Sequence, residues 1–275
     1  MRGETSLASD KVARQKFASQ LRDSGVQSGT VAIELFDFAN MLDDNAAVER
    51  ALTDPSRPAH DKIVLTDKLI GDTVDPLTKE ILEDLVSRKW SRVDHIANAV
   101  EDLAVDATLY YADVKGVTST VAIELAKIHS AFINIAPVRA KLSDIRMSAN
   151  SRVAFLRELL RNQRLNPLTV RLAEHATRDL RNRRFLSTLQ WLIDEISHHM
   201  GESVVTVTSA IPLRKEQFAK IIAAYSAKLG RQVHINSVVD PNVLGGMRIQ
   251  YGAEVHDSTV VAQLQRLKQM VSVPA

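Results

Sequence analysis

The sequence contains no cysteine, and this absence excludes several kinds of structure and chemistry. A chain without cysteine has no disulfide framework, no thiolate ligands for a metal and no thiol nucleophile. Aromatic residues are also few, at 5% of the chain. Leucine, alanine, valine and isoleucine therefore supply most of the apolar residues, and the leucine and alanine among them favour helices.

Glycine and proline are scarce too, with 10 and 8 in 275 residues, which excludes a collagen-like or low-complexity chain. No apolar run approaches the roughly 20 residues that a membrane-spanning helix needs. The first residues, MRGETSLASD, lack the apolar stretch of a secretory signal. We therefore expect a globular cytoplasmic protein, which can still attach to a membrane-bound assembly.

Motifs that carry catalysis are missing as well. The sequence has no P-loop, HExxH or GxSxG motif. His198 and His199 are adjacent, so on a helix their side chains point about 100° apart and are poorly placed to hold one metal ion. The sequence therefore predicts a protein that is not an enzyme and that has no cofactor and no metal site.

The net charge of +2 conceals two blocks of opposite sign. Residues 31–106 hold 17 acidic and 8 basic side chains, whereas residues 139–184 hold 12 basic and 4 acidic ones. Such blocks indicate two surfaces with different partners, two segments that face each other, or solvated helix faces. The arginines of the basic block, RNRR at 181–184 among them, leave nucleic-acid binding as an alternative function.

An internal repeat with a period of 90 residues organises the helical part of the chain. TVAIEL occurs at 30–35 and again at 120–125, and VTS occurs at 117–119 and 207–209. Between these runs, DPLT at 75–78 aligns with NPLT at 166–169 after a slip of one residue. A collinear series of this kind indicates a tandem duplication over residues 30–119 and 120–209.

Each copy has the pattern of several short helices. The sequence predicts an opening helix over 9–23, N-caps at Thr30 and Thr120, and a helix start at Asp75-Pro76. In the second copy, the place of the opening helix falls at 101–113, so that copy lacks one or borrows the end of the preceding helix. The helix over 60–71 is expected to turn four apolar residues inward: Ile63, Val64, Leu69 and Ile70.

The pattern changes after Gly201. Strands are predicted over 204–209 and 232–240, with a helix over 211–229 between them and Gly230 as its C-cap. A third strand, a turn at Gly252, a short return and a helix over 258–270 follow. The expected fold is mainly α, with an N-terminal helical bundle (1–115), a duplicated helical bundle (116–200) and a small C-terminal α/β domain (201–275).

The segment VDPNVLGGMRIQYG at 239–252 resembles the signature of the delta subunit of bacterial F-type ATP synthases. The mitochondrial counterpart of that family is the oligomycin-sensitivity-conferring protein. The order strand, VTSAIPL, helix with Gln217 and Gly-Gly turn is also similar to the family, as is the helical N-terminal region. The motif itself predicts a shaped hairpin, in which glycines permit a positive φ or a close backbone approach. Its structural residues are Asp240, Gly245, Gly246 and Gly252.

The resemblance implies a stator component that links the peripheral stalk to the alpha-beta catalytic head and resists rotor torque during proton-driven ATP synthesis. It implies two partners, the N-terminal helix of an alpha subunit and the b subunit of the stalk, with membrane association only through the complex. It places the protein at the cytoplasmic face of the bacterial cell membrane. The partner-binding residues would be those of a helix-binding groove and of the C-terminal segment: Phe17, Leu21, Leu77, Ile81, Leu85, Arg248, Leu264 and Leu267.

Overall fold

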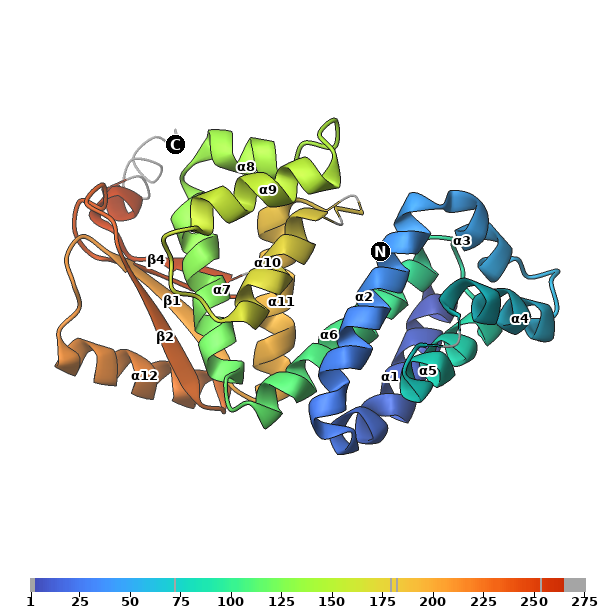
Figure 1. Cartoon of the computed structure of the whole chain (residues 1–275). Helices are drawn as coiled ribbons and strands as arrows, with labels where there is room; N and C mark the ends of the chain where they lie inside the picture. Colours follow the sequence, from blue (N-terminus) through green and yellow to red (C-terminus); the bar gives the residue numbers. More distant parts are fainter. Residues whose placement is uncertain (1–2, 72, 179, 182, 253, 265–275) are drawn as a thin grey trace, which may run out of the picture. The chain divides into compact units, whose positions relative to one another are not determined.

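The computed structural model describes residues 3–264 except 72, 179, 182 and 253. The chain divides into two compact units, Met1–Val117 and Thr118–Ala275 (Figure 1). The regular secondary structure in the described residues of the first unit is helical, with no strand. Its elements are α1 (Glu4–Asp23), the 3₁₀ helix η1 (Gly25–Gln27), α2 (Ser28–Asp44), α3 (Ala46–Thr53), α4 (Ala59–Ile70), α5 (Pro76–Ser87) and α6 (His95–Val114).

The core of the first unit lies around α6, which packs against α1, α2 and α5. Apolar residues occur on nearly every side of α6, from Ile96 through Val100 and Leu103 to Leu109, and all four are at most 1% exposed. A helix that is apolar all round is stable only when other helices cover it. The neighbours of α6 supply that cover through residues such as Phe17 of α1.

The second unit consists of a helical bundle followed by a sheet with its own helix. The bundle comprises α7 (Thr118–Ile133), α8 (Ala136–Leu142), α9 (Ala149–Leu160), α10 (Pro167–Arg178) and α11 (Phe185–Met200). The remaining elements are β1 (Ser203–Ser209), α12 (Lys215–Leu229), β2 (Val233–Val239), β3 (Met247–Tyr251) and β4 (Glu254–Asp257). The predicted fold class, mainly α with a small C-terminal α/β part, is confirmed.

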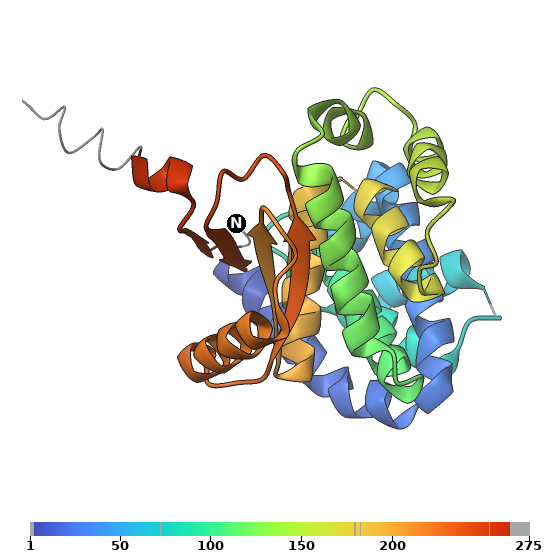
Figure 2. The same ribbon diagram turned by 90° about the vertical axis from the view of Figure 1, so that its left-hand side faces the viewer.

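The strand order of the sheet is β2-β1-β3-β4. β1 and β2 run parallel and are joined by α12, while β3 and β4 are antiparallel to their neighbours. α12 covers one face of the sheet, and α7 and α11 lie on the other (Figure 2). β1 is buried on both faces, with Val205 and Val207 packing against Ile221 of α12. The sheet and the duplicated bundle therefore pack together within one compact unit.

The helices of the two copies follow the 90-residue repeat. α2, α3, α4 and α6 begin 90 residues before α7, α8, α9 and α11, and α5 begins 91 residues before α10. The same offset relates α1, which begins at Glu4, to α6, which begins at His95, within one residue. The opening-helix position of the second copy thus coincides with the last helix of the first copy, and α6 belongs to the first unit.

The repeated motifs TVAIEL and [D/N]PLT form a hydrogen-bonded pair in each copy. In the first copy, the Glu34 carboxylate accepts hydrogen bonds from the Asp75 backbone N–H and from Thr78 Oγ1. In the second copy, Glu124 accepts the corresponding bonds from Asn166 and Thr169. The glutamate of one motif therefore holds the first turn of the helix that the other motif starts.

Two local predictions are wrong. Helices α2 and α7 begin at Ser28 and Thr118, so Thr30 and Thr120 lie inside the first turn and are not N-caps. Helix α4 leaves Val64 and Leu69 exposed at 37% and 40%, and the residues that it buries are Lys62 and Thr66. The apolar pattern predicted the wrong inward face of α4, because a lysine and a threonine occupy the buried face.

No single helix among the described residues is both long and apolar enough to cross a membrane, although α7 and α8 pass that test together as a pair bent by 117°. The described residues also contain no group of three or more side chains that is arranged to hold a metal ion.

Candidate partner-binding surfaces

The seam between α1 and α5 is the place where the sequence predicted a helix-binding groove. Phe17 and Leu21 of α1 and Ile81 and Leu85 of α5 are all 0% exposed. Leu77, at the start of α5, is half-buried. Four of the five predicted residues therefore form the core of the first unit, and Leu77 alone among them reaches the surface.

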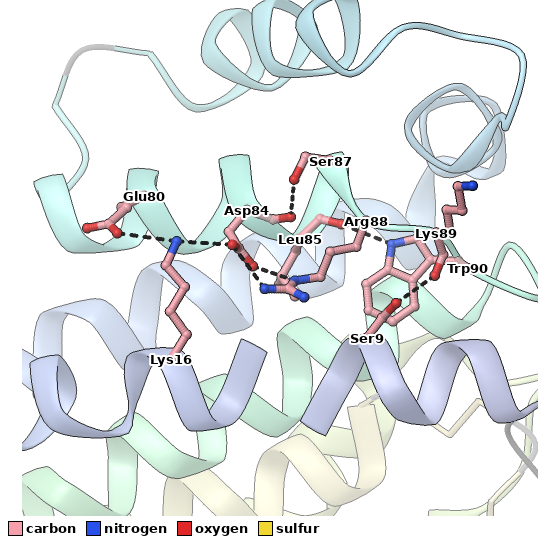
Figure 3. A network of polar contacts seen from close by, with 9 residues as sticks. All are labelled: Ser9, Lys16, Glu80, Asp84, Leu85, Ser87, Arg88, Lys89 and Trp90. Atoms are coloured by element: carbon pink, nitrogen blue, oxygen red, sulfur yellow. Dashed lines mark hydrogen bonds and ion pairs between the residues drawn. The ribbon is translucent and has the colours of Figure 1, made fainter. Parts of the chain in front are cut away.

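Polar contacts close the outer side of this seam (Figure 3). Lys16 of α1 reaches across to α5, with its Nζ 3.0 Å from Asp84 and 3.5 Å from Glu80. Arg88 binds the same Asp84 carboxylate through Nε and Nη2. Ser9 Oγ of α1 donates to the carbonyl of Lys89, two residues beyond the end of α5, at 2.9 Å. A partner helix at this seam would meet a charged surface above a filled core.

The corresponding residues of the second copy are equally buried. Leu168 of α10 is 9% exposed, and Leu172 and Ala176 are 0% exposed. The apolar face that begins at the [D/N]PLT motif therefore packs inward in both copies.

Several cations of the basic block make contacts within the second unit. Arg157 forms two hydrogen bonds with Glu174, and Arg152 donates to four backbone carbonyls. The Arg146 guanidinium, hydrogen-bonded to Asp144, lowers the pKa of that carboxyl to about 2. These contacts reduce the positive charge available to phosphates, but they leave the alternative of nucleic-acid binding as a prediction.

The C-terminal motif builds a tight turn. Asp240 Oδ1 accepts hydrogen bonds from the backbone N–H and the side-chain amide of Asn242, and the Asp240 N–H donates to the Ser209 carbonyl. Gly245 and Gly246 then adopt φ angles of +97° and +76°. A Cβ on Gly246 would lie 2.3 Å from the Ser258 carbonyl oxygen, so close approach of two backbone segments requires glycine there.

A pocket of about 310 Å³ lies beside this turn, lined by residues 209–213, Gln217 and residues 245–247. Gln217 also caps α12, because its Oε1 accepts from the Arg214 backbone N–H at 2.9 Å. This contact caps the start of α12 although Arg214, at the N-cap, is not one of the usual capping residues. Ile211 lines the pocket and Leu244 directly precedes its lining residue Gly245. These two side chains are 73% and 71% exposed.

The other predicted C-terminal residues lie nearby in the sequence. Arg248, on β3, is half-buried and stands opposite Asp257 of β4 and Thr208 of β1 in the sheet register. Leu264 is 60% exposed on a helical segment over 260–264. Leu267 lies outside the described residues. Gly252 follows β3 with a φ of +53°, as expected for a turn.

Ile211 and Leu244 were not among the sequence-predicted binding residues. The available signal was their position, since both are large apolar residues within turn-forming stretches, next to Pro212 and Gly245. Both side chains are more than 70% exposed, and exposed large apolar side chains can mark an interaction site.

Comparison with known proteins identifies the family. The family model described as "ATP synthase delta (OSCP) subunit" matches residues 105–271. The chain belongs to the ATP synthase delta family. The ATP synthase subunit delta of Bifidobacterium adolescentis is 57% identical over 275 residues, covering 100% of both chains. That of Bifidobacterium longum subsp. infantis is 55% identical, covering 100% of this chain and 99% of the relative. The subunit delta of Salinispora tropica is 32% identical over 96% of each chain.

The family model matches the second copy of the repeat and leaves most of the first copy outside the match. The delta family model begins at residue 105, near the end of α6, and continues through the second bundle into the sheet. The family's helical domain therefore corresponds to the second bundle, and α1–α5 precede the match. The expected resemblance of the N-terminal bundle to the family's helical domain lies outside this match and stays a prediction. The relatives above share the long form, because each aligns over nearly its full length.

Proposed function

We propose that this chain is the non-catalytic stator subunit that joins the peripheral stalk to the alpha-beta head of an F-type ATP synthase. The subunit resists the torque of the rotor, and it associates with the cytoplasmic face of the cell membrane only through the complex. Family membership supports the assignment to the ATP synthase. The specific role as a link between stalk and head is our inference.

One observation carries the proposal furthest. The family match spans both the second bundle and the C-terminal sheet, and these two parts pack into one compact unit through α7, α11 and β1. A link between two large partners must transmit force without coming apart, and the continuous core between the bundle and the sheet gives the second unit the rigidity that such a link needs. The sheet end carries exposed Ile211, Leu244 and Leu264, which offer an apolar contact for the b subunit.

For the alpha-subunit helix, we retain the α1–α5 seam as the proposed site, with different contact residues. The buried core residues of the seam have an indirect role, because they fix the spacing of α1 and α5: Phe17, Leu21, Ile81 and Leu85. Direct contact would come from half-buried Leu77 and from Val12, which is 50% exposed and lies on the same face of α1 as Lys16. Helix-in-groove recognition of this kind uses a row of apolar anchors with charged neighbours.

Native mass spectrometry of the full chain, mixed with detached alpha-beta head or with the soluble part of the b subunit, tests the proposal. The expected result is one copy per head and a separate complex with b. Val12→Asp is expected to weaken head binding only, and Leu244→Asp is expected to weaken b binding only. Val26→Asp, at a 58% exposed site on η1, is the matched control. A chain that binds neither partner at moderate salt would contradict the stator role.

A further inference from the structure

A second pocket lies in the first unit, at the end of the α1–α5 seam where α5 ends. Its volume is about 430 Å³, within the range of small-molecule sites, and it lies among the α3–α4 loop, the start of α4 and the segment after α5. Four cationic residues line it, namely Arg57, Lys62, Arg88 and Lys89, and none of its described lining residues is acidic. The pocket therefore concentrates positive charge.

The main evidence for a ligand site is the environment of Lys62. Lys62 is 6% exposed, it lines the pocket, and no hydrogen bond or ion pair reaches its ammonium from the described part of the chain. Burial lowers its pKa, with the Asp54 charge acting in the opposite direction. The side chain is buried and its ammonium has no hydrogen bond or ion pair with the described residues, so its N–H donors are available to a ligand in the pocket.

At the corresponding position of the second copy, the cation is hydrogen-bonded to the backbone. Arg152 is the repeat counterpart of Lys62, 90 residues later, and it is also 6% exposed. Its guanidinium donates to the carbonyls of Asp144, Met147, Thr177 and Arg178. In the second copy, backbone carbonyls therefore accept the hydrogen bonds of the buried cation. In the first copy, the ammonium of Lys62 faces a pocket and has no such acceptors among the described residues.

The neighbours of Lys62 favour an anion with more than one charge. The side chains of Arg57 and Lys89 have no hydrogen bond or ion pair with the described residues, whereas Arg88 is paired with Asp84. Ala59 lines the pocket as the first residue of α4, a helix of 12 residues whose N-terminal amides favour negative charge. The Asp54 carboxylate lies near Arg57 and Lys62, and the Asp84 carboxylate is paired with Arg88, but neither aspartate lines the pocket.

We propose that this pocket binds a phosphate group, either free inorganic phosphate or the phosphate of a nucleotide. Three unpaired cations and a helix N-terminus match the charge of a phosphate dianion better than that of a monovalent carboxylate. Lys62 and Arg57 hold the oxyanion, and Trp90, which also lines the pocket and donates its indole N–H to the Leu85 carbonyl at 3.0 Å, reports its arrival.

Trp90 makes the test direct. The chain has two tryptophans, so in the full-length Trp191→Phe variant Trp90 is the sole tryptophan. Its fluorescence is followed during titration with inorganic phosphate and with ATP, against sodium chloride at equal ionic strength. We expect a saturable change with one or both phosphate compounds and none with chloride. Saturation by ATP alone assigns a nucleotide, and saturation by both assigns a site for the phosphate group itself.

Variants decide whether the signal comes from this pocket. Lys62→Met and Arg57→Gln are each expected to weaken binding by at least about tenfold, because each removes a charge-assisted hydrogen bond. Lys68→Met, at an exposed position on the same helix, is expected to leave it unchanged. Arg57 is exposed, so its variant keeps the test decisive if Lys62→Met fails to fold. A response that chloride reproduces, or one that Arg57→Gln leaves unchanged, would overturn the proposal.

Discussion

Glu34 of α2 and Thr78 of α5 are joined by a hydrogen bond of 2.6 Å between Oε2 and Oγ1, and their repeat counterparts Glu124 and Thr169 are joined by one of the same length. Two motifs that lie more than 40 residues apart in each copy thus form one structural unit. The contact explains why TVAIEL and the PLT run are both present in each copy, because the glutamate and the threonine depend on each other.

Removing the threonine hydroxyl should therefore destabilise the unit that contains it. Thr78→Val and Thr169→Val are isosteric changes at positions that are 0% exposed, and each leaves a partly buried carboxylate short of a donor. We expect a loss of about 1–2 kcal/mol in the free energy of unfolding of the affected unit. Urea unfolding followed by Trp90 for the first unit and Trp191 for the second, each as the sole tryptophan, measures this loss.

Thr30→Val and Thr120→Val are the matched controls, since both threonines are exposed on the helices that carry the glutamates. Their effect should stay within about 0.5 kcal/mol. Equal effects at the buried and the exposed threonines would show that the hydrogen bond contributes nothing.

Gly230 and Gly246 both have a positive φ, but they should respond differently to alanine. Gly246→Ala places a Cβ 2.3 Å from a backbone oxygen at a φ of +76°, so we expect a loss of stability above about 2 kcal/mol. Gly230→Ala meets nothing within 4 Å and suffers only the strain of its φ of +66°, about 1 kcal/mol. Hydrogen exchange of β3 and α12 compares the two variants, and similar protection in both would contradict the close approach at Gly246.

Arg152 and Lys62 occupy equivalent positions with opposite energetic roles. Arg152→Met leaves four buried or half-buried carbonyl contacts without their donor, and we expect a cost of about 3 kcal/mol or more in the second unit. Lys62→Met breaks no hydrogen bond and removes a buried charge, so the stability of the first unit should stay within about 1 kcal/mol of its original value or rise. Thermal unfolding of each unit, read by its own tryptophan, distinguishes the two outcomes.

His129, on α7, predicts a pH dependence of the second unit. Burial lowers its pKa below the ordinary value of 6.5, so the folded state favours the neutral ring. The stabilisation is present above pH 6.5 and is lost as the pH falls through the lower folded pKa, because the unfolded chain then binds the extra proton. His129→Gln should make the decline in stability shallower as the pH falls below 6.5. An unchanged pH profile in that variant would assign the decline to other groups.

The sequence predicted the order of the elements well because their signals are local. Asp75-Pro76 predicted the start of α5, and the Asp75 side chain does accept from the Leu77 N–H. Gly230 predicted the end of α12, and it adopts a left-handed conformation there. Each of these signals depends on a few adjacent residues and on backbone geometry that no distant contact needs to supply.

Predictions of which side chains are buried and which are exposed were less successful, because burial depends on how the helices pack against one another. Ile63 and Val64 have the right chemistry for a core, yet α4 turns Lys62 and Thr66 inward. Phe17 and Ile81 lie on the predicted α1–α5 seam, but they fill it completely. A single sequence shows that these residues are apolar, but it does not show whether a partner or the protein itself covers them.

The 90-residue repeat has a consequence for how the gene can change. Helices α2 and α7 begin at Ser28 and Thr118, one 90-residue period apart, and neither of these starting points lies inside another helix. Unequal recombination between the two copies would therefore delete or add one complete set of helices without cutting through any of them. Chain length in this lineage is thus expected to vary in steps of one bundle, and a gene that has lost a step would still encode the glutamate and threonine pair in every remaining copy.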